Sequence, residues 1–229
     1  MIQANGKITE LWLSPGGLVG GRIACSPVID PAPGQYLLGR SDEPGECLPS
    51  ALFVYPDEEG SLLAAPPLPQ SWRVGTRLSL RGPCGKGFRV PAGAQKVALA
   101  ALDGNPYRLM PLIHQALARH AGVTLYSRSI PRQLPVAVEI LPLDMLPDAL
   151  NWADFLAVEI SMSDLALLHA CLGAPAGQHC PCPTQVLVAT PMPCGGVAEC
   201  GVCSVHTRKG WQLACTDGPV FDFDQMVLP

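Results

Sequence analysis

The feature that most constrains the fold is a change of pattern near residue 93. Before it, short runs rich in Val, Leu and Tyr alternate with Gly and Pro breakers, which is typical of the strands of a small barrel or sandwich. The runs are KITELWL, GRIACSPVI, GQYLLGR, ALFVYP, SLLAAP and TRLSLRGP. Residues 1–93 are therefore expected to form an antiparallel β barrel.

After residue 93 the strands alternate with helical patterns. QKVALAAL, GVTLYSRS and TQVLVAT have the composition of buried strands, whereas LMPLIHQALARHAG repeats Leu and Ile on one helical face and ends at a glycine. A second helical pattern, SDLALLHACLG, begins at Ser163, which we take as its N-cap. Strands that alternate with helices predict a Rossmann-like parallel sheet over residues 94–190.

Charge narrows the range of partners. The 229 residues carry a net charge of −4 and no cluster of Lys or Arg, which argues against nucleic acid or an anionic membrane as the main partner. Charged residues make up 15% of the chain, against about 25% in an average protein. The 25 prolines and 23 glycines dilute charge, but a poorly charged surface also suggests contact with a partner subunit.

Apolar runs such as VALAAL, at 97–102, are far shorter than the roughly 20 residues that span a bilayer. The opening MIQANGKITE lacks the pattern of a signal peptide. We therefore expect a cytoplasmic protein, in which the ten cysteines are not disulfides and a tight cluster of them serves a metal or a redox reaction.

Four cysteines, Cys194, Cys200, Cys203 and Cys215, form such a cluster with the spacing C-x5-C-x2-C-x11-C. Plant-type [2Fe-2S] sites use C-x4-C-x2-C and a distant fourth cysteine, whereas zinc ribbons prefer two C-x2-C pairs. Neighbouring glycines let the backbone wrap closely and direct amide groups at sulfurs. The pattern favours a [2Fe-2S] cluster on these four residues within a C-terminal segment, 191–229, and leaves zinc and free cysteines as alternatives.

The tail also resembles a known family. Cys194-Gly195, the C-x2-C pair and the ending C-T-D-G-P-V-F at 215–221 are similar to the iron-sulfur segment of the electron-transfer subunit of class 1B dihydroorotate dehydrogenase, in the ferredoxin-NADP reductase superfamily. The first gap, 195–199, holds five residues where the family has four. The resemblance implies a ferredoxin-reductase-like barrel, a Rossmann-like domain and a [2Fe-2S] segment.

Two barrel motifs extend the resemblance, PGQYLL at 33–38 and GTRLSLRGPCGKGF at 75–88. The family's flavin motif R-P-x-S corresponds to 46–50. The motif's arginine is absent there, and Glu46 lies near the expected position of the diphosphate. Arg40 or Arg81 could take the place of the missing arginine. The resemblance implies FAD, and the residues expected to bind it are Tyr36, Pro49, Ser50, Gly82 and Gly85.

The nicotinamide motif is degraded. The family's G-G-G-x-G-x-x-P turn corresponds to 101–108, where only Gly104 remains, and its C-G-P signature is replaced by EISMSD at 159–164. Glycines there let the phosphates approach the helix N-terminus. We therefore expect no ordinary NAD(P)H binding.

The remaining cysteines and histidines give no second site. We interpret His169, Cys171, His179, Cys180 and Cys182 as core or surface residues rather than metal ligands. Three scattered barrel cysteines, Cys25, Cys47 and Cys84, are expected to behave as small apolar residues, and His206 as a surface residue.

These observations predict an electron-transfer subunit that relays electrons through its cluster to or from a flavoprotein oxidoreductase catalytic subunit in a hetero-oligomer, with no independent catalytic site. By resemblance, the partner would be a dihydroorotate dehydrogenase catalytic chain of pyrimidine biosynthesis. The first alternative is a noncatalytic, zinc-stapled scaffold on a decayed reductase fold. The second is a complete NADH-oxidising flavoenzyme.

Overall fold

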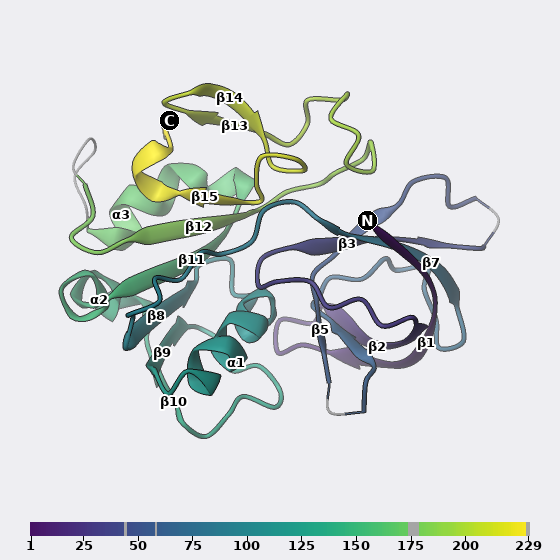
Figure 1. Cartoon of the computed structure of the whole chain (residues 1–229), viewed down its shortest axis with the longest axis horizontal. Helices are drawn as coiled ribbons and strands as arrows, with labels where there is room; N and C mark the ends of the chain where they lie inside the picture. The colour runs from purple at the N-terminus through teal and green to yellow at the C-terminus, as the bar shows by residue number, and fades with distance from the viewer. Residues whose placement is uncertain (44, 58, 174–178, 228–229) are drawn as a thin grey trace.

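The computed structural model describes residues 1–43, 45–57, 59–173 and 179–227. Its N-terminal half is a nearly closed antiparallel barrel (Figure 1). Seven strands form it in the order β4-β3-β7-β1-β2-β6-β5. They are β1 (Ile2–Leu13), β2 (Val19–Ser26), β3 (Tyr36–Ser41), β4 (Ser50–Leu52), β5 (Val54–Pro56), β6 (Leu62–Ala64) and β7 (Arg77–Cys84).

The barrel closes because its strands alternate between apolar and polar side chains. Along β1 every second residue from Ala4 to Ile8 is buried, which is the period of a strand with one face in a core. Ile8, Ile23, Leu80 and Trp72 fill the interior.

The second half contains a six-stranded sheet in the order β10-β9-β8-β11-β12-β15. Its first five strands are mutually parallel, and the last runs antiparallel to β12. The strands are β8 (Lys96–Ala101), β9 (Gly122–Ser127), β10 (Val138–Leu141), β11 (Phe155–Ser161), β12 (Thr184–Ala189) and β15 (Val220–Asp222). The predicted fold class, a barrel followed by a Rossmann-like sheet, is confirmed.

Short helices connect these strands. The α-helices are α1 (Met110–Ala118), α2 (Leu146–Trp152) and α3 (Leu168–Leu172), and the 3-10 helices are η1 (Pro106–Leu109), η2 (Leu143–Met145), η3 (Met162–Leu167) and η4 (Phe223–Gln225). The expected N-cap at Ser163 was wrong. Ser163 lies inside η3, whose N-cap residue is Ser161, and its hydroxyl meets the Ser161 hydroxyl at 2.7 Å.

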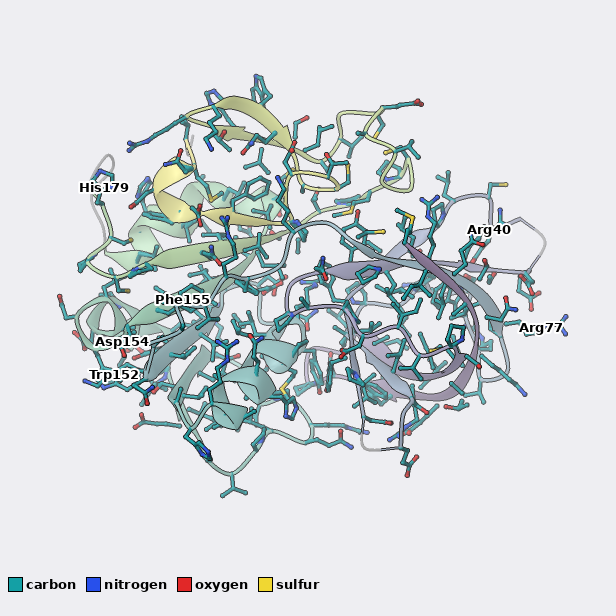
Figure 2. All side chains as sticks on the ribbon, viewed as in Figure 1. Arg40, Arg77, Trp152, Asp154, Phe155 and His179 are labelled. Carbon is teal, nitrogen blue, oxygen red and sulfur yellow. The ribbon has the colours of Figure 1, made fainter. Side chains whose placement is uncertain are left out.

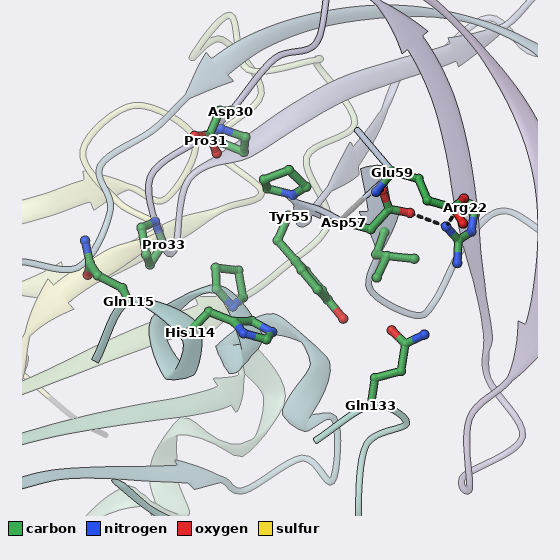
Figure 3. Close-up of a pocket in the computed structure, with 13 residues that line it drawn as sticks. Arg22, Asp30, Pro31, Pro33, Tyr55, Asp57, Glu59, His114, Gln115 and Gln133 are labelled. Atoms are coloured by element: carbon green, nitrogen blue, oxygen red, sulfur yellow. Dashed lines mark hydrogen bonds and ion pairs between the residues drawn. The ribbon is translucent and has the colours of Figure 1, made fainter. Parts of the chain in front are cut away.

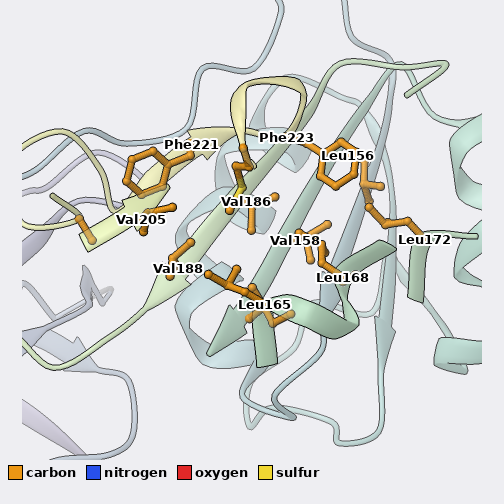
Figure 4. Close-up of a cluster of buried hydrophobic side chains, with 14 of the residues drawn as sticks. Leu156, Val158, Leu165, Leu168, Leu172, Val186, Val188, Val205, Phe221 and Phe223 are labelled. Carbon is orange, nitrogen blue, oxygen red and sulfur yellow. The ribbon is translucent and has the colours of Figure 1, made fainter. Parts of the chain in front are cut away.

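An apolar core joins the sheet to the C-terminal segment. Val158 and Val186 of the sheet pack with Leu168 of α3, Val205 and Phe223 (Figure 4). All five side chains are buried. The C-terminal segment is therefore packed into the same core as the parallel sheet.

The C-terminal segment leaves the sheet after β12 and returns to it as β15. Between them lies the hairpin of β13 (Ser204–Thr207) and β14 (Gly210–Leu213), drawn at the top of Figure 1. The division of the chain into three units, with boundaries near residues 93 and 190, stays a prediction. The second and third units share one core, because β15 of the C-terminal segment completes the second sheet. Among the helices that the structure describes, none is long and apolar enough to cross a membrane.

Candidate metal centre

The four predicted ligands lie in the connection from β12 to β15, and their thiols come together in two pairs. Cys200 is the neighbour that most strongly shifts the pKa of the Cys194 thiol, and Cys203 is the neighbour that most strongly shifts the pKa of the Cys215 thiol. Cys200 is exposed, whereas Cys203 and Cys215 are buried. In the described part of the chain, no group of three or more Cys, His, Asp or Glu side chains closes around one metal position.

The first pair is held by a loop with unusual backbone geometry. Gly195, Gly196, Ala198 and Gly201 all have φ between 64° and 74°, a region that glycine enters at little cost and alanine does not. Hydrogen bonds from the Cys200 side chain and then from the backbone of Glu199 lower the pKa of the Cys194 thiol to about 6. The loop thus directs donors at this sulfur and favours its thiolate form.

The second pair is fixed by the chain around the β13–β14 hairpin. The amide of Ala214 donates to the carbonyl of Cys203 at 2.9 Å, and the amide of Leu213 donates to a carboxylate oxygen of Asp217 at 3.0 Å. Burial, followed by the neighbouring Cys203, raises the pKa of the Cys215 thiol to about 11. This pair therefore lies in an apolar, enclosed position beside the donor-rich position of the first.

The barrel holds the segment from the other side. The Tyr36 hydroxyl donates to the carbonyl of Cys215 at 2.9 Å, and Arg81 donates to the carbonyl of Gly195 at 3.0 Å. A Cβ at Gly195 would lie 2.6 Å from Cγ of Pro49, and one at Gly196 would lie 3.1 Å from the Tyr36 hydroxyl. Glycine is therefore required at 195 for close packing as well as for backbone geometry.

This packing involves three of the five residues predicted to bind FAD. Tyr36 is fully buried against the segment, and Pro49 contacts Gly195. A Cβ at Gly85 would lie 2.7 Å from the carbonyl of Gly218. Gly82 is buried against Leu37, and Ser50 is half-buried at the start of β4.

Next to these residues the barrel has a cavity of about 270 Å³. It is lined by Gln3, Leu38, Arg40, Cys47, Pro49, Ser79 and Arg81, so both arginines proposed to replace the missing flavin arginine face it. Glu46 is held elsewhere, because Trp72 Nε1 donates to its carboxylate at 2.8 Å. The volume is below the roughly 300–1,000 Å³ of sites for larger ligands. In this arrangement the cavity accommodates part of FAD only.

The turn that corresponds to the nicotinamide motif is occupied by its own side chains. The Arg108 guanidinium pairs with Asp103 at 3.0 Å and with Glu159, whose side chain is fully buried. Burial raises the pKa of Glu159 well above its ordinary range, although Arg108 opposes the shift. Arg108 also lies over the ring of Phe53 in the barrel, 5.6 Å from its centroid. The charged side chains of this turn are thus paired with one another.

Residues outside the cluster fall into two groups. Cys180, Cys182 and His179 form no metal group within the described residues; His179 Nδ1 instead meets Asp224 at 2.9 Å.

Trp211, which could not be singled out from the sequence, is 72% exposed on the β13–β14 hairpin, and its ring stacks on His206 at 4.8 Å between centroids. A lone tryptophan between Gly210 and Gln212 carries no sequence signal for this position.

Comparison with known proteins supports an iron-sulfur cluster in the C-terminal segment. Residues 190–227 match the iron-sulfur cluster binding domain of dihydroorotate dehydrogenase B. No curated protein matches the chain by sequence.

Solved structures are similar over most of the chain. An NADH-dependent reduced ferredoxin-NADP oxidoreductase has a TM-score of 0.73 at 18% identity, covering 97% of this chain and 90% of that one. A ferredoxin-NADP+ reductase from Plasmodium falciparum has a TM-score of 0.52 at 14% identity, covering 81% and 95%. The ferredoxin reductase of carbazole 1,9a-dioxygenase has 0.56 at 14%, covering 76% and 65%. At these identities the likeness establishes the fold.

Proposed function

We propose that the chain is an electron-transfer subunit with a [2Fe-2S] cluster on Cys194, Cys200, Cys203 and Cys215. Two findings support the proposal: the match to the iron-sulfur cluster binding domain of dihydroorotate dehydrogenase B and the ferredoxin-reductase-like fold. Together they confirm the predicted resemblance. The cluster accepts and donates single electrons when bound. Its partner is a flavoprotein oxidoreductase catalytic chain.

The pairing of the thiols carries the proposal. A [2Fe-2S] cluster takes two protein ligands on each of two irons, whereas zinc takes four ligands around one centre. Here Cys200 is the main neighbour of the Cys194 thiol and Cys203 is the main neighbour of the Cys215 thiol. Two pairs joined by a glycine-rich loop fit the two-iron group better than zinc.

The surroundings of the two pairs differ in a way that suits a relay. The pair Cys203 and Cys215 is buried beneath the hairpin and the barrel, which excludes water from that side. The first pair lies in the loop that exposes Val197 and Val202. Exposed apolar side chains beside a redox group are suited to a partner's docking surface. We therefore place electron exchange on the side of Cys194 and Cys200.

The partner that the family suggests is a dihydroorotate dehydrogenase catalytic chain, which would place the protein in cytoplasmic pyrimidine biosynthesis. Coexpression with such a chain and gel filtration tests this assignment. A stable complex that Val202→Asp weakens, while Val136→Asp on the exposed 130s loop does not, supports it. Two separate peaks for the unmodified pair would contradict it.

Cofactor content distinguishes the remaining possibilities. FAD would have its anionic part beside Arg40 and Arg81, and binding would require the barrel and the cluster segment to separate further at Tyr36 and Pro49. NADH binding is opposed by the carboxylates of Asp103 and of the buried Glu159. The chain would then receive electrons from its partner rather than from NADH.

The test is an absorption spectrum with iron, sulfide, zinc and flavin analysis on protein purified without oxygen. About two irons and two sulfides per chain, with a brown colour, are expected. One zinc and no visible absorption would contradict the relay and favour the zinc-stapled scaffold. Bound flavin that NADH bleaches would instead support the complete flavoenzyme.

A further inference from the structure

A second cavity, of about 780 Å³, lies between the barrel and α1. Strands β2, β5 and β6, the 30–33 loop, α1 and the loop after β9 contribute its walls (Figure 3). The volume is within the range of small-molecule sites, which often occur between two structural units. In Figure 1, α1 is drawn at the bottom of the view and the hairpin of the cluster segment at the top, so this cavity is separate from the proposed redox centre.

The charge of the cavity is negative. Among the described residues that line it, Asp30, Asp57 and Glu59 supply three carboxylates and Arg22 is the only Lys or Arg. The Arg22 guanidinium is already paired, with Asp57, with Glu59 at 3.2 Å and with Glu10 at 3.4 Å. Among the described residues Asp30 makes no ion pair, so the cavity offers a carboxylate and no unpaired cation. A negatively charged ligand would be repelled.

Two aromatic rings form the middle of the cavity. The rings of Tyr55 and His114 lie 5.8 Å apart between centroids. Burial lowers the pKa of His114, so its imidazole is neutral at pH 7. A neutral imidazole adds no charge that would repel a cation, and the face of a tyrosine attracts one within about 6 Å.

The Tyr55 hydroxyl is the polar group at the centre of the cavity. The side chain is 7% exposed, and none of the hydrogen bonds among the described residues uses its hydroxyl, which solvent reaches through the cavity. Figure 3 shows it pointing into the cavity toward Gln133. Burial raises the pKa of Tyr55 to about 12, so the group remains a neutral hydroxyl that can accept a hydrogen bond. Amide oxygens of Gln115 and Gln133 add further acceptors.

We propose that this cavity binds a small organic cation with an amine or guanidinium group, held by Asp30 and the hydroxyl and ring of Tyr55. An ammonium or guanidinium group has only donors, which match carboxylate, amide and hydroxyl acceptors. The site is independent of the cluster and goes beyond the proposed relay.

The test is titration calorimetry on the complete protein with agmatine, which carries both kinds of cation. Saturable binding is expected, with butane-1,4-diol and AMP at least tenfold weaker. Asp30→Asn should weaken agmatine binding by about tenfold or more, the loss typical of one hydrogen bond to a charged group. Tyr55→Phe, which keeps the ring, should weaken it less than Tyr55→Leu does.

Asp144→Asn is the matched control, because it makes the same change at an exposed aspartate outside the cavity. It should leave the affinity unchanged, and circular dichroism should show that all variants are folded. The proposal is overturned by three results: no saturable heat with agmatine, equal affinity in Asp30→Asn and the control, or tighter binding of AMP or the diol.

Discussion

The junction of the barrel with the cluster segment, which is the proposed redox site, and the turn at 101–108 differ in the chemistry that holds them together. At the junction, glycines and backbone carbonyls let chain segments approach closely, as Gly195 does against Pro49. At the turn, Asp103, Arg108 and Glu159 fill the space with charged side chains. The comparison teaches that one fold can be held by close backbone packing at one place and by paired charges at another.

The largest effect is expected from replacing a cysteine of the proposed cluster. Cys203→Ser takes one thiolate from the buried pair, and we expect the visible absorption and nearly all iron to be lost, since a serine hydroxyl is a poor ligand for iron in such a cluster. Cys25→Ser, in the barrel, is the control and should keep both. Full iron content in Cys203→Ser would show that the four-cysteine assignment is wrong.

The second largest effect concerns the turn. Arg108→Met leaves Glu159 buried without its partner, which should lower the free energy of unfolding by about 3–5 kcal/mol. Arg77→Met removes an exposed pair with Asp42 at the edge of the barrel (Figure 2) and should cost about 0–1 kcal/mol. Urea denaturation measures both.

A double variant sharpens this result. Replacing both Arg108 and Glu159 by methionine should recover most of the loss, because no unpaired charge then remains. Equal stability of Arg108→Met and Arg77→Met would contradict the view that the turn is held by a buried ion pair.

A smaller effect is expected at the junction. Gly195→Ala and Gly75→Ala both place alanine at positive φ, 64° and 97°, at a cost of about 1–2 kcal/mol. Only the first also meets a neighbour, Cγ of Pro49 at 2.6 Å, whereas a Cβ at Gly75 meets nothing within 4 Å. Gly195→Ala should therefore cost more in unfolding free energy and alter the visible spectrum. Equal losses of unfolding free energy in the two variants would show that the barrel and the cluster segment can move apart enough to accept the added methyl group.

The smallest effect is a dependence of stability on pH through Glu46, which the barrel holds away from the junction. Burial opposes ionisation of Glu46, but hydrogen bonds from Ser71, Trp72 and Ser41 outweigh it and lower its pKa below the ordinary 4.5. A lowered pKa means that ionised Glu46 stabilises the folded state above pH 4.5, and this contribution is lost as the pH falls through the folded-state value.

Glu46→Gln lacks this contribution at every pH. Its difference in stability from the unmodified protein should therefore shrink between pH 7 and pH 3, as thermal unfolding at each pH would show. A constant difference across this range would contradict the role of the carboxylate.

Most strands could be predicted because their periodicity is local. β1, β7 and β8 follow from alternating or continuous apolar runs, and α1 follows from one apolar face. Strand β15 was missed, because three residues after a glycine-proline step have no period, and its formation depends on pairing with β12. Helix α3 is shorter than its pattern suggested because η3 takes up the first half.

The cysteine cluster could be predicted from spacing and residue type, but its setting could not. The hydroxyl of Tyr36 meets the carbonyl of Cys215 across 179 positions of the chain, and no local pattern encodes such a contact. Likewise, the sequence showed that residues 101–108 depart from the family's nucleotide motif, but not that Arg108 and Glu159, 51 positions apart, would pair there.

The route of the chain through the cluster segment has a consequence for modularity. β12 ends at Ala189 and β15 begins at Val220, and the two strands are neighbours in one sheet. Seen from the sheet, the cluster segment is a long hairpin loop whose two ends already lie together. Such a loop can change in length or sequence without altering the register of the two strands, provided that side chains such as Val205 continue to fill the core beside the sheet.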